Sequence, residues 1–246
     1  MTSMNTFKFL RNFVRLLKFA AEATRLPTAH LHFEKNSNSP ENVKIFKHFT
    51  KPHPRYKLIP NKAIGMALVD LGKFCDSDSY MSSVNRKDLG GYHGKRALRR
   101  GYSFQEIDQN SYIEDIYAIN TSIMERQGRR MDPTYFNKRT YYEKKPNYRY
   151  FGIINKDGKL VAYCNVVTYG NFSATDRLLG YKNNDGTMYL LLVEIICLLI
   201  NDKRVQYFMY DTFFGVQEGL RSFKHRLGFQ PYRVHYSLAQ EICRPK

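Results

Sequence analysis

Cysteines are few in this sequence, and none is spaced as a metal ligand would be. The 246 residues contain four, Cys75, Cys164, Cys197 and Cys243, with no Cys-x-x-Cys pair among them. Metal sites of the zinc type need ligands at close, regular spacings, so we expect no bound metal. Three of the four lie within or beside apolar runs, which predicts buried, reduced thiols and a cytoplasmic location.

Long hydrophobic runs are also missing. The longest, near residues 188–200, is interrupted by Glu194 and falls short of the roughly 20 apolar residues that a membrane-spanning helix needs. Hydrophobic residues still make up 43% of the chain and aromatic residues 15%, which is enough for a packed core. The length suits one large domain, with or without an extension.

Acidic residues are scarce relative to basic ones. The chain has 22 Asp and Glu against 39 Lys and Arg, a net charge of +17. Such a surface attracts polyanions, so DNA, RNA or anionic lipid is the expected partner. The densest basic stretch, residues 86–100, has six cations around one acid, Asp88. We expect Arg96, Arg99 and Arg100 to contact phosphate there, and the alternative is a solvated basic helix.

The first 60 residues have the pattern of an extension. Residues 7–25 place basic side chains on one side of a predicted helix and apolar ones on the other. This helix packs on the body of the protein, makes a peripheral contact with a membrane surface, or serves as a targeting peptide. Residues 27–62 are rich in Pro, Asn, Ser and His, which predicts an irregular linker with one short element near 43–49. We therefore divide the chain into an extension, 1–60, and a folded domain, 61–246.

The remainder alternates between helical and strand patterns. Residues 63–81 favour a short helix and turn, and 102–107 a strand. Two helices are expected next, one opened by Ser111 with Glu114 as its capping box, the other by Asp132 and Pro133. Further strands are expected near 148–155, 159–169, 173–181, 205–211 and 230–238, with helices near 187–201 and 216–227. This order predicts an α/β (α+β) fold with a largely antiparallel sheet, one parallel crossover and flanking helices.

Four segments of the sequence resemble a known superfamily. They are "GYSFQEIDQNSYIEDIYAINTSIMERQG", "VAYCNVVTYG", "DGTMYLLLVEIICLLI" and "YFMYDTFFGVQEGLRSFKHRLGFQPYRV". Over residues 86–238 the chain resembles GNAT acyltransferases, and within them the FemABX-like branch that transfers amino acids from tRNA. The resemblance implies an acyltransferase with a GNAT-like central twisted sheet, and acyl-CoA (acetyl-CoA) or aminoacyl-tRNA as the donor.

The loop before the long helix departs from the GNAT pattern. GNAT enzymes cradle the pyrophosphate of CoA with an Arg/Gln-x-x-Gly-x-Gly/Ala loop at this point. Here Arg177 and Gly180 match its start, but Lys182 stands at the final small position, and Gly186 and Thr187 open the helix. Either Gly186 and Thr187 bind a pyrophosphate at the helix N-terminus, or the donor is not CoA.

Acyl transfer to an amine needs a group that takes the amine proton and a group that meets the developing negative charge. Glu194 is the one charged residue of an apolar helix, where burial would raise its pKa toward that of a useful base, and a structural pairing with a buried Arg or Tyr is the alternative. Tyr210 and Asp211 end a strand at which GNAT-like sheets splay. Tyr210 is expected to protonate the leaving group, or else to pack in the core, and Asp211 is the next candidate base.

A polar cluster ends the helix before Gly128. The resemblance places this region beside the acceptor, where guanidinium groups could grip a phosphate or carboxylate. The alternative is a capped helix end with solvated arginines. The expected acceptor-binding residues are Asn120, Ser122, Arg126, Gln127 and Arg129.

Three functions fit these observations. The first is an N-acyltransferase that moves an acyl or aminoacyl group onto an amine and associates with nucleic acid, with tRNA as donor or a modified base in DNA as acceptor. The second is a membrane-surface acyltransferase that acts on a cell-envelope sugar or a peptidoglycan precursor. The third is a non-catalytic GNAT-like protein that binds nucleic acid. We expect the first.

Overall fold

The computed structural model describes residues 24–35, 40–54, 57, 59–126 and 128–240. Nearly all of the predicted helix at 7–25 lies outside these residues, as do Gln127 and Cys243, so the expectations for them stay predictions. None of the described helices has the length and hydrophobicity that crossing a bilayer requires.

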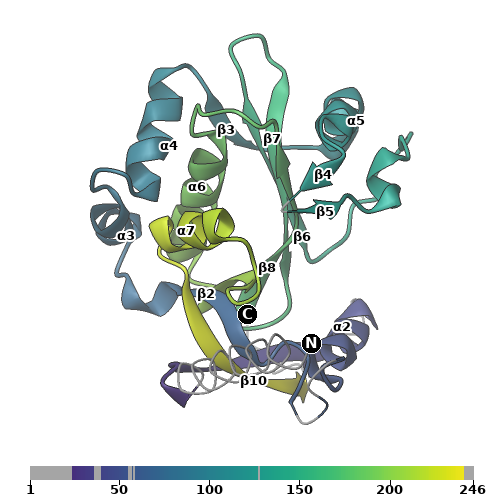
Figure 1. Cartoon of the computed structure of the whole chain (residues 1–246), viewed down its shortest axis with the longest axis vertical. Helices are drawn as coiled ribbons and strands as arrows, with labels where there is room; N and C mark the ends of the chain where they lie inside the picture. The colour runs from purple at the N-terminus through teal and green to yellow at the C-terminus, as the bar shows by residue number, and fades with distance from the viewer. Residues whose placement is uncertain (1–23, 36–39, 55–56, 58, 127, 241–246) are drawn as a thin grey trace, which may run out of the picture.

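One eight-stranded sheet organises the described chain (Figure 1). Its strands, in spatial order, are β1 (Thr28–Lys35), β10 (Gln230–Gln240), β2 (Ile64–Asp70), β9 (Tyr207–Thr212), β8 (Phe172–Gly180), β7 (Leu160–Thr168), β6 (Tyr148–Ile154) and β3 (Ser103–Glu106). Neighbours are antiparallel except for the pairs β1–β10 and β8–β9. The predicted mostly antiparallel α/β fold is therefore confirmed, with a second parallel pair that was not predicted.

Helices cover both faces of this sheet (Figure 1). On one face α3 (Ser77–Val84) and α4 (Gly90–Arg99) pack against α6 (Thr187–Asp202), whose side chains are largely buried. On the other face α5 (Ile113–Thr121) packs on β7 and β8. At the far edge α2 (Pro40–Thr50) packs on β1 and β10. The short helix α7 (Glu218–Arg226) follows β9.

Two strands lie where the sequence analysis expected none, so the irregular linker at 27–62 and the helix near 63–81 are wrong in part. In β1, Ala29, Leu31 and Phe33 are buried and the residues between them are exposed, a strand alternation obscured by the many polar residues nearby. Its partner β10 lies about two hundred positions away along the chain, so no local signal announced the pairing. The sheet therefore draws strands from both sides of residue 60. The helix α2 covers the short element expected near 43–49.

The two helices expected between 108 and 145 are shorter than predicted. A 3₁₀ turn, Gln109–Tyr112, precedes α5, and the cap is Asp108, whose carboxylate accepts from the Asn110 backbone N–H at 3.0 Å. Asp132 caps as expected, but only one 3₁₀ turn follows it, Pro133–Phe136. Beyond that turn the Tyr142 N–H donates to the side chain of Asn110 at 2.8 Å, so a tertiary contact replaces helical hydrogen bonding.

Candidate functional site

The strands β8 and β9 separate after three residue pairs. They pair from Phe172 with Tyr207 to Ala174 with Met209, and the described structure joins them no further. β8 continues along β7 to Gly180, whereas β9 continues along β2. Near the end of β9, Asp211 has a left-handed backbone with φ 46°, which is uncommon for a residue other than glycine. The sheet thus opens between these strands, as the resemblance implied for the strand that ends at Tyr210 and Asp211.

Arg126 closes the unpaired edge of β8. It lies in a small hairpin of β4 (Glu125–Arg126) and β5 (Arg129–Arg130). Its guanidinium donates to the carbonyls of Leu178 at 3.1 Å and Gly180 at 3.0 Å, two residues apart on β8. Burial lowers the pKa of Arg126, because these acceptors are neutral and cannot offset the loss of water. Arg126 therefore supplies hydrogen bonds that the backbone N–H groups of a neighbouring strand would otherwise donate to these carbonyls of β8.

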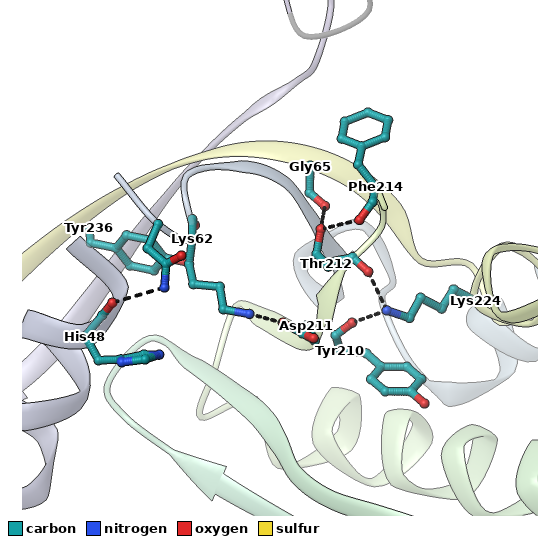
Figure 2. A network of polar contacts seen from close by, with 10 residues as sticks. His48, Lys62, Gly65, Tyr210, Asp211, Thr212, Phe214, Lys224 and Tyr236 are labelled. Atoms are coloured by element: carbon teal, nitrogen blue, oxygen red, sulfur yellow. Dashed lines mark hydrogen bonds and ion pairs between the residues drawn. The ribbon is translucent and has the colours of Figure 1, made fainter. Parts of the chain in front are cut away.

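Lys224 of α7 binds carbonyl groups of β9, as Arg126 binds those of β8 (Figure 2). It is 1% exposed, and its Nζ donates to the carbonyls of Tyr210 at 2.7 Å and Thr212 at 2.6 Å. The same Nζ lies 4.3 Å from the centre of the Tyr210 ring. Burial lowers the pKa of Lys224 to about 8, and the charge of Asp211 offsets part of that effect. Each of the two strands that separate thus has two carbonyl groups bound by a cation, the half-buried Arg126 on β8 and the buried Lys224 on β9.

A cavity of about 780 Å³, here called the α6 cavity, opens at the N-terminal end of α6. Its walls come from α4, the loop before α6, α7 and the β4–β5 hairpin. The N-cap of α6, Gly186, offers no side chain to the first N–H groups of the helix. Free helix N–H groups and several guanidiniums suit phosphate oxygens. The cations that line the cavity are Arg96, Arg126, Lys182 and Arg226, against one acid, Glu125.

Position 186 requires a glycine because the chain there has a positive φ and passes close to the backbone of α4. Its φ is 91°, and a Cβ there would lie 2.3 Å from the carbonyl oxygen of His93. The preceding Asp185 accepts hydrogen bonds from Arg100 and from the Tyr102 hydroxyl, the latter at 2.7 Å. Arg100 therefore holds the loop at the helix N-terminus and is absent from the lining of the α6 cavity.

Three nitrogen atoms beside the α6 cavity lack partners. Both ring nitrogens of His93 and Nε of Arg96 are buried, with no hydrogen bond to any described residue. Burial, followed by the charges of Arg96 and Arg226, lowers the pKa of His93 and keeps its ring neutral at neutral pH. Unmade hydrogen bonds of buried groups are costly, and these three atoms are themselves shielded from the cavity by neighbouring side chains.

A second cavity, of about 560 Å³, lies at the opening between β8 and β9 and is here called the splay cavity. The helix α2 and the turn at Tyr135 complete its walls. Burial and the nearby Lys51 and Lys62 lower the pKa of His48 at its rim. Burial raises the pKa of Tyr210, so its hydroxyl stays protonated and able to donate. Residues with ionisable side chains that line this cavity include His48, Lys62, Asp176, Tyr210 and Asp211, and the Tyr210 ring also packs against Phe229.

The two carboxylates of the splay cavity differ in their surroundings. Asp211 forms an ion pair with Lys62 (Figure 2). Asp176 is the extra residue of a bulge in β8, and it makes no hydrogen bond or ion pair with any residue the structure describes. The cavity walls raise its pKa, although more than a third of the residue remains exposed. Asp176 is thus the carboxylate that is free to take a proton.

The structure brings together only some of the residues predicted from the sequence. Arg96, Arg126, Gly180, Gly186 and Thr187 line the α6 cavity, and Tyr210 and Asp211 line the splay cavity. Glu194 lines neither, although burial does raise its pKa. Arg99 is exposed on α4 and also lines neither.

The remaining predicted residues have local contacts. Asn120 is buried and accepts from the Tyr163 hydroxyl at 2.7 Å, and Ser122 donates to the Ile119 carbonyl at 2.7 Å. The Arg177 guanidinium lies 4.8 Å from the centre of the Tyr135 ring, and Arg129 is exposed in β5. Within the described chain, no group of three His, Cys, Asp or Glu side chains could hold a metal ion.

Three residues of the site were not predicted from the sequence: Lys224, Asp176 and Lys62. Lys224 lies in the last turn of α7 next to His225 and Arg226, where basic side chains are ordinarily solvated, so its burial was not expected. Asp176 is the one acid of the strand "FSATDRLLG". Lys62 lay in the presumed linker, and nothing local indicated that it would reach Asp211.

No family model and no curated protein matches this sequence. Among solved structures the chain is similar to FemX, with a TM-score of 0.54 and 11% identity over 80% of this chain and 66% of that one. It also matches the C-terminal domain (DUF2156) of a putative lysylphosphatidylglycerol synthetase from Agrobacterium fabrum (0.47, 17%, 69% and 58%) and L-PGS from Bacillus licheniformis (0.44, 15%, 70% and 61%). The chain thus spans 58% to 66% of the lengths of these three structures. At this identity the likeness to FemX concerns the fold, and this chain has the GNAT-like fold that the sequence resemblance implied.

Proposed function

We propose that this chain is an N-acyltransferase, which moves an acyl or aminoacyl group from a phosphate-bearing donor to an amine. The observation that carries the proposal is the opening between β8 and β9, with a cation-rich cavity beside it and a carboxylate-bearing cavity within it. Such an arrangement brings an anionic donor and a nucleophile to one place, which is the main requirement of a group transfer.

The donor phosphates bind in the α6 cavity. Arg96 and Arg226 supply charge-assisted hydrogen bonds there, and the N–H groups that follow Gly186 face the same space. Acyl-CoA (acetyl-CoA) and aminoacyl-tRNA both carry phosphate groups, which in acyl-CoA lie at the far end of the pantetheine arm from the acyl group, and the cavity chemistry suits either. Lys182, which departs from the GNAT loop pattern, adds a further cation to this wall.

The reaction takes place in the splay cavity. A bond forms between the amine nitrogen and the acyl carbon while the bond from that carbon to the sulfur or oxygen of the donor breaks. Asp176 takes the proton of the amine, because it is unpaired and its pKa is raised. The Tyr210 hydroxyl, protonated and without a partner in the described chain, gives its proton to the leaving group and regains one from Asp176 through solvent. In this scheme Glu194 has no role.

Association with nucleic acid is part of the proposal. Lys95 and Arg99 are exposed on α4, beside the α6 cavity, and the chain carries a net charge of +17. The resemblance to the FemABX-like branch favours tRNA, as the donor, over DNA. The membrane-surface alternative depends on residues 7–25, nearly all outside the described chain.

Amide formation tests the proposal. The full chain is mixed with acetyl-CoA, or in parallel with aminoacylated tRNA, and an aliphatic amine, and the product is detected by mass spectrometry. Wild-type protein should form the amide, and D176N should form it about 10²- to 10⁴-fold more slowly. The matched variant D157N, in an exposed turn, should match the wild type. Amide formation by D176N at the wild-type rate would remove Asp176 as the proton acceptor, and no product with either donor would refute the proposed function.

A further inference from the structure

The α6 cavity and the splay cavity are separate spaces, because no described residue lines both of them. The proposed function puts the phosphates of the donor in the first space and its acyl group in the second. One molecule then has to extend across both. The residues at the boundary therefore decide whether a donor can reach the opening between β8 and β9.

The Arg126 side chain lies at this boundary. Arg126 lines the α6 cavity, as does Gly180, whose carbonyl accepts one of its hydrogen bonds at 3.0 Å. Leu178, whose carbonyl accepts the other at 3.1 Å, lines the splay cavity. Burial lowers the pKa of Arg126, and nearby tyrosines, first among them Tyr210 of the splay cavity, oppose that effect. The guanidinium thus joins the walls of both spaces along the edge of β8.

The contact between Arg126 and β8 is one that a ligand can replace. Both of its acceptors are neutral carbonyls, whereas a phosphate would supply the opposite charge and match the fork of the guanidinium. The hairpin that carries Arg126 is small, because β4 and β5 have two residues each. A two-stranded hairpin is only marginally stable on its own. Arg126 can therefore leave β8 at modest cost when an anion enters the α6 cavity.

We propose that Arg126 closes the passage between the α6 cavity and the splay cavity until a phosphate in the α6 cavity draws its guanidinium away from β8. The carbonyls of Leu178 and Gly180 then accept hydrogen bonds from water or from N–H groups of the donor. Arg126 is in this way a specificity-determining residue, because a molecule that bears an acyl group without phosphate leaves the passage closed. The inference rests on the proposed function, since the ligand that opens the passage is the donor of that reaction.

Phosphate-free fragments of the two donors test this coupling. Acetylpantetheine carries the acyl group and the arm of acetyl-CoA, and an amide analogue of aminoacyl-adenosine carries the acyl end of aminoacyl-tRNA. Each fragment is titrated calorimetrically into the full chain, with and without saturating inorganic pyrophosphate. In the wild type, pyrophosphate should strengthen binding of at least one fragment by about tenfold or more, the scale of the hydrogen bonds that hold Arg126 to β8. To R126A that fragment should bind without pyrophosphate as tightly as it binds to the wild type with it, and pyrophosphate should add nothing further.

Two further variants complete the experiment. R126K keeps the charge, but one ammonium group does not reproduce the planar contact with two carbonyls, so the effect of pyrophosphate should be smaller than in the wild type. R130A alters an exposed arginine of the same hairpin and should keep the full effect. Fragment binding that pyrophosphate does not strengthen in the wild type, or an equal strengthening in R126A, would overturn the inference. Coupling without amide formation from either full donor would instead refute the proposed function and leave the passage standing, and amide formation without coupling would do the reverse.

Discussion

Replacing Lys224 with methionine should change stability in a way that depends on pH. The side chain is 1% exposed and donates to two carbonyls of β9. Methionine fills similar volume, so the K224M variant removes the charge and both hydrogen bonds without opening a large cavity. Because burial lowers the pKa of Lys224 from 10.5 to about 8, the unfolded chain binds more protons than the folded chain between these values.

The magnitude follows from that shift. The free energy of unfolding of the wild type should rise with pH above 8, and its advantage over K224M should grow by about 2 kcal/mol between pH 7 and pH 9.5. At pH 7 two effects oppose each other. The carbonyls left without donors cost about 1–3 kcal/mol each, and removal of a poorly solvated charge returns about 3 kcal/mol. The variant should therefore be near wild-type stability at pH 7 and clearly weaker at pH 9.5.

Guanidinium denaturation at several pH values measures this difference. The comparison is between wild type and variant at each pH, so the titration of tyrosines common to both cancels. K95M, which alters an exposed lysine of α4, is the matched control and should track the wild type throughout. Parallel stability curves for wild type and K224M from pH 7 to pH 9.5 would refute the account of a buried, carbonyl-bound ammonium group.

Three further predictions concern the candidate site. R96A and R226A should each weaken binding of CoA and flatten its dependence on salt, measured by calorimetry, while R99A should leave both unchanged because Arg99 does not line the α6 cavity. G186A should lower the free energy of unfolding by more than about 1 kcal/mol in thermal denaturation, because alanine disfavours a φ of 91° and its Cβ would strike the His93 carbonyl. E194Q should leave amide formation unchanged; since burial raises the pKa of Glu194 in the folded state, the variant should gain stability over the wild type as pH rises above 4.5.

Local patterns predicted most of the fold, and long-range pairing accounts for what they missed. The helix α6 and the strands β6, β7 and β8 lie close to their expected bounds, because their apolar runs and turns are contiguous in the sequence. β1 has a strand alternation of its own, but its backbone hydrogen-bonding partner is the distant strand β10, whose residue Arg233 pairs with Thr28. A sequence alone does not show which distant strand will supply the missing hydrogen bonds.

The candidate site was predicted only in outline, because part of it depends on contacts between segments that are distant in the sequence. Arg126 and Tyr210 were found from their positions at the ends of a helix and a strand. The role of Lys224 depends on its contacts with two carbonyls of β9, and Asp176 is the extra residue of a bulge that borders the splay cavity. Neither feature is visible in the composition or the periodicity of the sequence, so both could be identified only from the three-dimensional structure.

The structure of a donor complex tests the central claim most directly. Crystals of the full chain with acetyl-CoA, and in parallel with an aminoacylated RNA, should show phosphate oxygens beside Arg96 and Arg226 at the N-terminus of α6. The acyl carbon should lie in the opening between β8 and β9, next to Asp176 and Tyr210. A donor whose phosphates lie away from α6, or whose acyl group does not enter that opening, would contradict the account.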